Sequence, residues 1–123
     1  MKQYDLLIVD DEKRFANMLA KRLSLRGANC EICYNGRQAL EQVGQKNFFL
    51  VLLDLHLPDI YGVDVLKGIK SISPMTHVII VTGHGTEKDR LACMQLGARA
   101  FMNKPVGLDE LMNILDQLEE ASQ

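Results

Sequence analysis

Unbroken apolar runs alternate with amphipathic segments along the chain. Three apolar runs are each followed by a polar residue, and they contain residues 6–9, 50–53 and 78–81. Strands that are buried on both faces of a sheet have this continuous apolar character. Two further segments, at 30–34 and 98–102, mix polar with apolar residues, which is typical of strands at the edges of a sheet.

Each strand-like segment is followed by a segment in which apolar residues recur at helical spacing. The predicted helices span residues 12–26, 36–45, 63–71, 87–96 and 108–120. The last helix has the clearest apolar stripe, which consists of Leu111, Ile114, Leu115 and Leu118. Gly27 directly follows the first helix and is a typical C-terminal cap.

Strands that alternate with helices predict a parallel sheet covered by helices on both faces. Among doubly wound folds, the strand order 2-1-3-4-5 places the second and fifth strands at the edges, where the two mixed segments belong. We therefore predict an α/β fold, a flavodoxin-like (βα)5 three-layer sandwich, that forms a single domain over residues 1–123. A chain of this length can bury a core without disulfides or a structural metal.

Composition and charge exclude several classes of function. The net charge is −2 and the pI is about 5.9, so we expect no direct nucleic-acid contact. No apolar stretch approaches the length of a membrane span or a signal-peptide core, so we expect a cytoplasmic protein with no membrane association. Cys30 and Cys33 lie three apart on a predicted strand and should point to opposite faces, which favours a buried apolar role over zinc or redox chemistry.

Five polar residues fall at the ends of predicted strands. Asp10 and Asp11 follow the first strand, and Asp54 follows the third. Thr82 ends the fourth strand and Lys104 ends the fifth. Ligands of such sheets bind beyond the carboxyl ends of the strands, at the point where the strand order reverses. We therefore expect these five side chains to share one crevice.

Carboxylates that converge repel one another unless a cation offsets their charge. Mg²⁺, with Mn²⁺ as an alternative, prefers such oxygen ligands and can bring a phosphoryl donor into the site. A carboxylate can then attack phosphorus and form an aspartyl phosphate, while Lys104 and Thr82 hold the phosphoryl oxygens. Taken alone, Lys104 would be a solvated surface lysine and Asp11 a cap of the first helix, a role that it can also combine with metal binding.

Four segments resemble the response-regulator receiver family. They are Asp10-Asp11, 54–62 (DLHLPDIYG), 81–83 (VTG) and 97–105 (GARAFMNKP), and they occur in the family order over nearly the whole chain. The resemblance implies that Asp54 accepts a phosphoryl group from a histidine kinase or a phosphotransfer protein. It also implies that Asp11, Asp54 and the backbone carbonyl of His56 bind Mg²⁺ directly, and that Asp10 acts mostly through water.

The same resemblance implies a switch. Thr82 and Lys104 would contact the phosphoryl group, Phe101 would be the aromatic residue that turns inward, and the Lys104-Pro105 bond would be cis. The chain would then be a phosphorylation-dependent signalling switch of a two-component system or phosphorelay, with no independent enzymatic turnover. It would act on an output domain or a target protein. We expect the face of the fourth helix, fifth strand and fifth helix to change, and an amphipathic last helix also permits a dimer there.

His56 and His84 lie two residues after Asp54 and Thr82, respectively, and should overlook the mouth of the site. Their plain interpretation is that of exposed loop histidines. The alternative is that their protonation alters the access of water to the acyl phosphate, because imidazole titrates near neutral pH.

Other functions remain as alternatives. A protein-interaction scaffold of the same fold would not be phosphorylated at all. An aspartyl-phosphate phosphatase or mutase usually has a second aspartate two residues after the nucleophile, where this chain has His56. A flavodoxin-type protein needs a phosphate-binding loop after the first strand, where Asp10, Asp11 and Glu12 would repel a phosphate. The glycine-rich loop with lysine of a nucleotide-binding switch is absent from the sequence.

Overall fold

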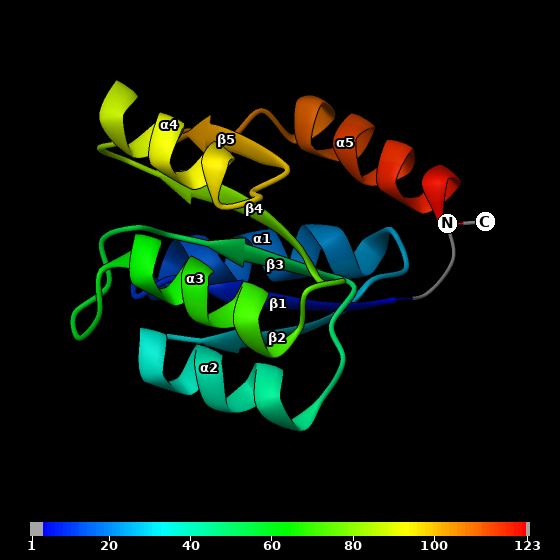
Figure 1. The fold of residues 1–123 in the computed structure, drawn as a ribbon. Coiled ribbons are helices and arrows are strands. Elements are labelled where there is room, and N and C mark those ends of the chain that lie inside the picture. Colours follow the sequence, from blue (N-terminus) through cyan, green and yellow to red (C-terminus); the bar gives the residue numbers. More distant parts are fainter. Residues whose placement is uncertain (1–3, 123) are drawn as a thin grey trace.

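The computed structural model describes residues 4–122, in which strands and helices alternate (Figure 1). The strands are β1 (Asp5–Val9), β2 (Asn29–Cys33), β3 (Leu50–Leu53), β4 (His77–Thr82) and β5 (Ala100–Asn103). The helices are α1 (Lys13–Leu25), α2 (Gly36–Gln45), α3 (Gly62–Ile72), α4 (Glu87–Gln95) and α5 (Leu108–Ala121). The predicted type and order of these elements are confirmed, and their predicted ends differ by one or two residues at most.

All neighbouring strands of the sheet pair in parallel, and their order is β2-β1-β3-β4-β5. Every residue of β3 is buried, whereas the edge strands β2 and β5 each bury one residue, Cys33 and Met102, respectively. The mixed composition of the two edge strands therefore reflects their exposure, and the predicted strand order is confirmed.

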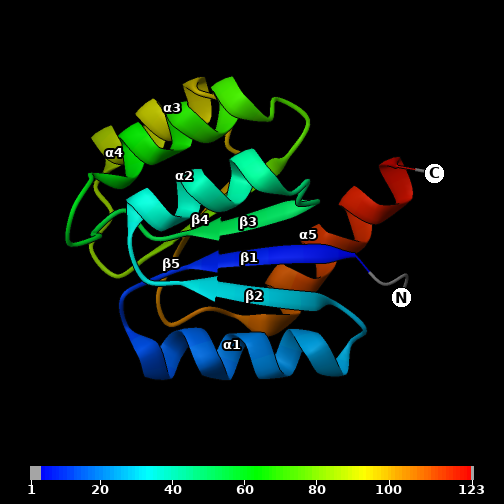
Figure 2. The ribbon, with the colours of Figure 1, turned by 90° about the horizontal axis from the view of Figure 1, so that it is seen from below.

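The sheet is the middle of three layers, as Figure 2 shows: α2, α3 and α4 cover one face, and α1 and α5 cover the other. Because side chains alternate along a strand, β1 contributes Leu7 and Val9 to the first core and Leu6 and Ile8 to the second. The predicted three-layer sandwich is confirmed. Among the helices of residues 4–122, none combines the length and the hydropathy that crossing a bilayer requires.

The two cysteines of β2 face opposite sides of the sheet, as predicted. Cys33 is buried in the core under α2, α3 and α4, and half-buried Cys30 packs against the core under α1 and α5. Burial raises the pKa of the Cys33 thiol to about 12, which keeps it protonated and unreactive. Both thiols therefore serve as small apolar side chains.

The start of α1 corrects one prediction. Asp11 does not cap this helix, because the N-cap position belongs to Glu12 and no side chain accepts a hydrogen bond there. Instead, Asp10 Oδ1 accepts the backbone N–H of Glu12 at 2.9 Å. The helix begins one residue later than the apolar spacing suggested, so Asp11 lies before the cap with its side chain exposed.

Candidate functional site

Three neighbouring strands, β1, β3 and β4, carry Asp10, Asp54 and Thr82 at their carboxyl ends. Asp10 follows β1 and Asp54 follows β3, whose last residues, Val9 and Leu53, are paired in the sheet. The N–H of Asp54 donates to the carbonyl of Val9 at 3.0 Å, which continues this pairing into the site. Asp10 is 2 % exposed, Asp54 is 4 % exposed and Thr82 is fully buried. The crevice is therefore polar although it lies above an apolar sheet.

Lys104 brings its ammonium group into this crevice from the end of β5. Its Nζ lies 2.8 Å from Asp10 Oδ2, 2.6 Å from Glu12 Oε1 and 3.5 Å from Asp54 Oδ2. The same Nζ lies 4.4 Å from the ring centroid of Phe15, within the range of a cation–π contact. Because its side chain is only 12 % exposed, the interpretation of Lys104 as a solvated surface lysine is wrong.

Burial and charge act in opposite directions on the groups of this cluster. Burial raises the pKa of Asp10, and the hydrogen bonds from Lys104 and from the Glu12 N–H reduce that effect. Burial alone would lower the pKa of Lys104, but its hydrogen bonds to Asp10 and Glu12 and the charge of Asp54 raise it above the ordinary value. Lys104 therefore stays protonated, and its one ammonium group interacts with three carboxyl groups.

Three carboxyl groups of the crevice can act together as cation ligands. Oxygens of Asp10, Glu12 and Asp54 all lie within 4.8 Å of one another. The sequence interpretation missed Glu12, whose only signal was its place as the third consecutive acid after β1. Asp11 is exposed and does not belong to this group, so its role as a direct metal ligand remains a prediction. The N–H of His56 donates to Asp54 Oδ1 at 3.3 Å, which places the His56 peptide beside the carboxylate.

Thr82 and Phe101 meet around Gly85. Thr82 Oγ1 is buried without a hydrogen-bond partner among residues 4–122. A Cβ atom at Gly85 would lie 2.5 Å from Phe101 Cζ and 2.8 Å from Thr82 Cγ2, so a glycine is required for this close approach. Phe101 is half-buried and packs against the core under α2, α3 and α4. The Lys104-Pro105 peptide bond is cis, as predicted.

Comparison with known proteins agrees with this geometry. The family model of the response regulator receiver domain matches residues 6–116. The chain belongs to the response regulator receiver domain family. Such domains are parts of two-component signal transduction systems, so the resemblance noted from the sequence motifs is confirmed.

Three similar proteins illustrate the likeness. An NtrX-like response regulator of Rickettsia felis is 35 % identical over 125 residues, which cover 100 % of this chain and 26 % of the relative. The transcriptional regulatory protein ZraR of Escherichia coli is 34 % identical over 113 residues, which cover 92 % of this chain and 26 % of the relative. The crystal structure of a CheY-like receiver domain protein from Methanospirillum hungatei is 29 % identical with a TM-score of 0.90, and the match covers 96 % of this chain and 95 % of that one. The receiver domain thus spans about a quarter of the length of the two curated relatives.

Two histidines of the receiver domain lie beside each other on loops next to the site. The rings of His56 and His84 have centroids 6.1 Å apart, and both residues are exposed. His56 Nε2 lies 3.1 Å from the carbonyl oxygen of His84, within hydrogen-bonding distance. The loop after β3 therefore contacts the loop after β4, and the effect of protonation on either loop remains a prediction.

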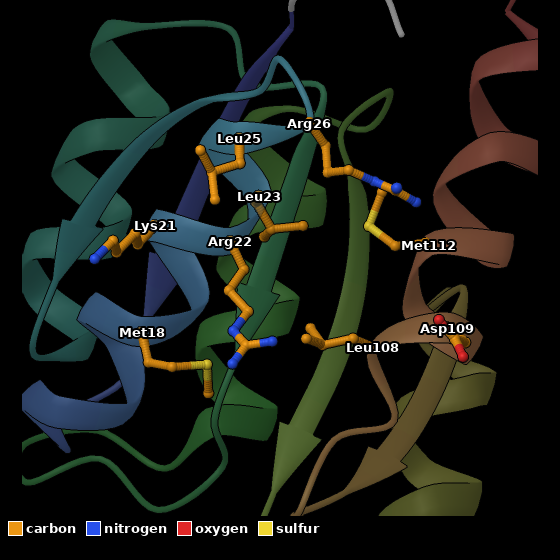
Figure 3. A pocket seen from close by; sticks show the side chains of 9 residues that line it. All are labelled: Met18, Lys21, Arg22, Leu23, Leu25, Arg26, Leu108, Asp109 and Met112. Carbon is orange, nitrogen blue, oxygen red and sulfur yellow. The ribbon is translucent and has the colours of Figure 1, made fainter.

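A cavity of about 670 Å³ lies elsewhere in the receiver domain, between α1 and α5 (Figure 3). It is lined by Met18, Lys21, Arg22, Leu23, Leu25, Arg26, Leu108, Asp109 and Met112. None of the residues of the acidic cluster contributes to this lining. The cavity is consequently separate from the acidic cluster at the carboxyl edge of the sheet.

Proposed function

We propose that this receiver domain is a phosphorylation-dependent switch that accepts a phosphoryl group on Asp54 in the presence of Mg²⁺. One observation carries the proposal: a buried cluster of carboxyl groups shares the single ammonium of Lys104, beside a buried Thr82 hydroxyl that has no partner in residues 4–122. The phosphoryl donor in this proposal is a histidine kinase or a phosphotransfer protein.

The donor atoms fit a hard divalent cation. Asp10, Glu12 and Asp54 offer carboxylate oxygens, which Mg²⁺ prefers, and Mn²⁺ accepts the same ligands. These carboxyl groups exceed the single ammonium in number, so the crevice carries an excess of negative charge that a cation offsets. When bound, the cation would shield the carboxylates from the incoming phosphoryl group. Asp11 and the carbonyl of His56 are further ligands in this proposal.

The side chains of the site then have distinct roles. A carboxylate oxygen of Asp54 attacks phosphorus and forms the acyl phosphate bond, while the bond between phosphorus and the donor histidine nitrogen breaks and that nitrogen keeps the electron pair. Lys104 Nζ, which lies 3.5 Å from Asp54 Oδ2, donates to one phosphoryl oxygen. The Thr82 hydroxyl donates to another, which gives this buried group the partner that it lacks.

Phosphorylation would act on the face formed by α4, β5 and α5. Thr82, Phe101 and Lys104 border this face, and a phosphoryl group adds charge and three acceptors beside them. The arrangement that satisfies those acceptors best becomes favoured. ZraR is a transcriptional regulatory protein, and we propose that this domain likewise controls an output domain or a target protein in the cytoplasm, either as a monomer or as a dimer through this face. It would do so without independent enzymatic turnover.

Intact-mass measurement after incubation with Mg²⁺ and acetyl phosphate tests the proposal. We expect one phosphoryl adduct in the wild-type protein and none in Asp54→Asn or in the presence of EDTA. Asp109→Asn removes an exposed carboxylate of α5 and should retain the adduct. A protein that forms no adduct and binds no beryllofluoride, a mimic of the phosphoryl group, would instead be an interaction scaffold.

A further inference from the structure

The loop between β3 and α3 is attached to the N-terminus of α2. Asp59 Oδ1 accepts the N–H of Gly36 at 2.8 Å, and Oδ2 accepts the N–H of Arg37 at 2.9 Å. The side chain of Asn35, the N-cap of α2, accepts the N–H of Gln38, and Asp59 completes the cap from a distant part of the chain. Burial would raise the pKa of Asp59, but these backbone donors hold it below its usual value.

Close packing makes this attachment rigid. A Cβ atom at Gly36 would lie 2.7 Å from Val65 Cγ2 and 3.1 Å from Ile60 Cβ, so the loop and α3 press directly on the first turn of α2. Helix α3 is itself anchored, because it buries Val65, Leu66 and Ile69. The loop between β3 and α3, which contains His56, is therefore held in place by its contacts with α2.

The other side of the loop is attached to α4. The Tyr61 hydroxyl donates a hydrogen bond to Asp89 Oδ1. Asp89 also forms a capping box with Thr86, since its Oδ2 accepts the Thr86 N–H at 3.2 Å and its own N–H donates to Thr86 Oγ1 at 3.1 Å. Burial and the neighbouring Asp89 raise the pKa of Tyr61 to about 12, and the hydrogen bond from Tyr61 lowers the pKa of Asp89. The phenol remains a donor and the carboxylate an acceptor.

Helix α4 depends on such polar contacts more than α3 does. Of its residues only Cys93 is buried, so few apolar contacts fix its position. Residues 83–85 connect Thr82, at the site, to Thr86, the N-cap of α4. A shift of Thr82 toward a phosphoryl group on Asp54 must therefore be absorbed in this short loop or be passed on to α4.

We propose that Tyr61 and Asp89 are positioning residues that hold the N-terminus of α4 in its unphosphorylated position. This inference rests on the proposed function. Their hydrogen bond, together with the contact between His56 and His84, ties α4 to a loop whose far side is fixed to α2. A phosphoryl group on Asp54 that draws Thr82 inward would also shift α4 and so strain the hydrogen bond between Tyr61 and Asp89. Removing that hydrogen bond should therefore favour the phosphorylated arrangement.

Beryllofluoride affinity at saturating Mg²⁺ tests the inference in Tyr61→Phe, Asp89→Ala and the double variant. Tyr61→Phe removes one hydroxyl and should tighten binding of the mimic about three- to tenfold, the equivalent of one net hydrogen bond. The same substitution should change affinity much less when Asp89 is already Ala, because the acceptor of the hydroxyl is then absent. Mg²⁺ affinity without the mimic should stay within about twofold, and Tyr34→Phe, a hydroxyl loss on another tyrosine, should behave as wild type.

A merely structural role for Tyr61 predicts that mimic binding does not tighten. Loss of a contact that supports the bound state would weaken mimic binding or leave it unchanged, and either result overturns the inference. Additive effects of the two substitutions would overturn it as well. Amide exchange in the first turn of α4, measured without Mg²⁺ or mimic, should be several-fold faster in Tyr61→Phe, and equal rates would show that the contact does not position the helix. A wild-type protein that binds no mimic would overturn the proposed function, while these exchange rates would still decide the role of the contact.

Discussion

Replacing Lys104 by methionine removes the one ammonium group that three carboxyl groups share. The ammonium lies 2.8 Å from Asp10 and 3.5 Å from Asp54, two carboxyl groups that are almost completely buried. Removing one partner of a buried ion pair typically costs about 3–5 kcal/mol of stability. The third partner, Glu12, is 63 % exposed and can turn to water, so we take the lower part of this range. We expect Lys104→Met to lose about 3–4 kcal/mol of unfolding free energy in metal-free buffer at pH 7.

Urea denaturation in EDTA measures this loss, and Lys46→Met is its matched control. Lys46 Nζ also contacts two carboxylates, at 2.7 Å from Glu31 and 3.3 Å from Asp5, but its side chain is 38 % exposed. Ion pairs between exposed side chains are screened by water and contribute little to stability, so the control should lose far less. If both lysine variants lost the same free energy, burial would not govern the energetics of the cluster and the reasoning would be refuted.

Two further measurements separate charge from packing in Lys104→Met. Burial raises the pKa of Asp10, so the folded protein gains stability from this group as the pH falls toward that raised pKa. Without Lys104 the pKa of Asp10 should rise further, so the difference in unfolding free energy between wild type and variant should decrease as the pH falls below 7. Mg²⁺ should also decrease this difference, because in the variant it binds the same carboxylate oxygens without competition from an ammonium group. If the difference in unfolding free energy between wild type and Lys104→Met depended on neither pH nor Mg²⁺, the substitution would have cost packing alone.

Three other substitutions make independent predictions, all measurable by urea denaturation. Thr82→Val removes a buried hydroxyl without a partner in residues 4–122, so it should leave the free energy of unfolding unchanged or raise it by about 1 kcal/mol. The same substitution should weaken beryllofluoride binding. A clear loss of stability would mean that the hydroxyl has a hydrogen-bond partner. Gly85→Ala should cost about 1–3 kcal/mol because its Cβ meets the ring of Phe101, and a crystal structure with that ring unmoved would contradict this cause. Asp59→Ala should cost about 1–2 kcal/mol by uncapping α2, whereas a change below about 0.5 kcal/mol would contradict the capping role.

The fold could be predicted because burial and sequence pattern agree almost everywhere. Strands β1, β3 and β4 are nearly fully buried, and each contains an unbroken apolar run. The edge strands are mixed because one side of each faces solvent. The ends of the elements were less predictable. Helix α1 begins at Lys13 because Asp10 accepts the N–H of Glu12, and the spacing of apolar residues cannot predict that hydrogen bond.

The site could be predicted as far as strand ends determine it. Asp10, Asp54, Thr82 and Lys104 each follow or end a strand, and parallel strands bring those ends together. The positions of the strand ends could not predict whether Asp11 or Glu12 contacts Lys104. The turn before α1 determines which of these two consecutive acids faces the ammonium group. The structure turns Glu12 toward the ammonium and leaves Asp11 exposed.

The contacts of the loop after β3 could not be predicted from spacing at all. Asp59 caps a helix more than twenty residues earlier in the chain, and Tyr61 reaches a cap 28 residues later. No periodic pattern links these positions, since each bond depends on how two loops meet above the finished sheet. Sequence motifs therefore locate the reactive groups, whereas the tertiary hydrogen bonds that tune them require the structure.

Two separate connections lead from the site to α4, and the side chains of Lys104 and Tyr61, one on each connection, can be altered one at a time. On the β5 side, the backbone N–H of Lys104 donates to the carbonyl of Thr82 at 2.9 Å, and Thr82 leads into the loop before α4. On the α3 side, Tyr61 holds Asp89 at the cap of the same helix. Lys104→Met removes the charge but keeps the backbone bond, whereas Tyr61→Phe removes the side-chain bond but keeps the charge. If the two connections oppose each other, the first substitution should weaken the binding of a phosphoryl mimic and the second should tighten it, so the double variant should fall between them.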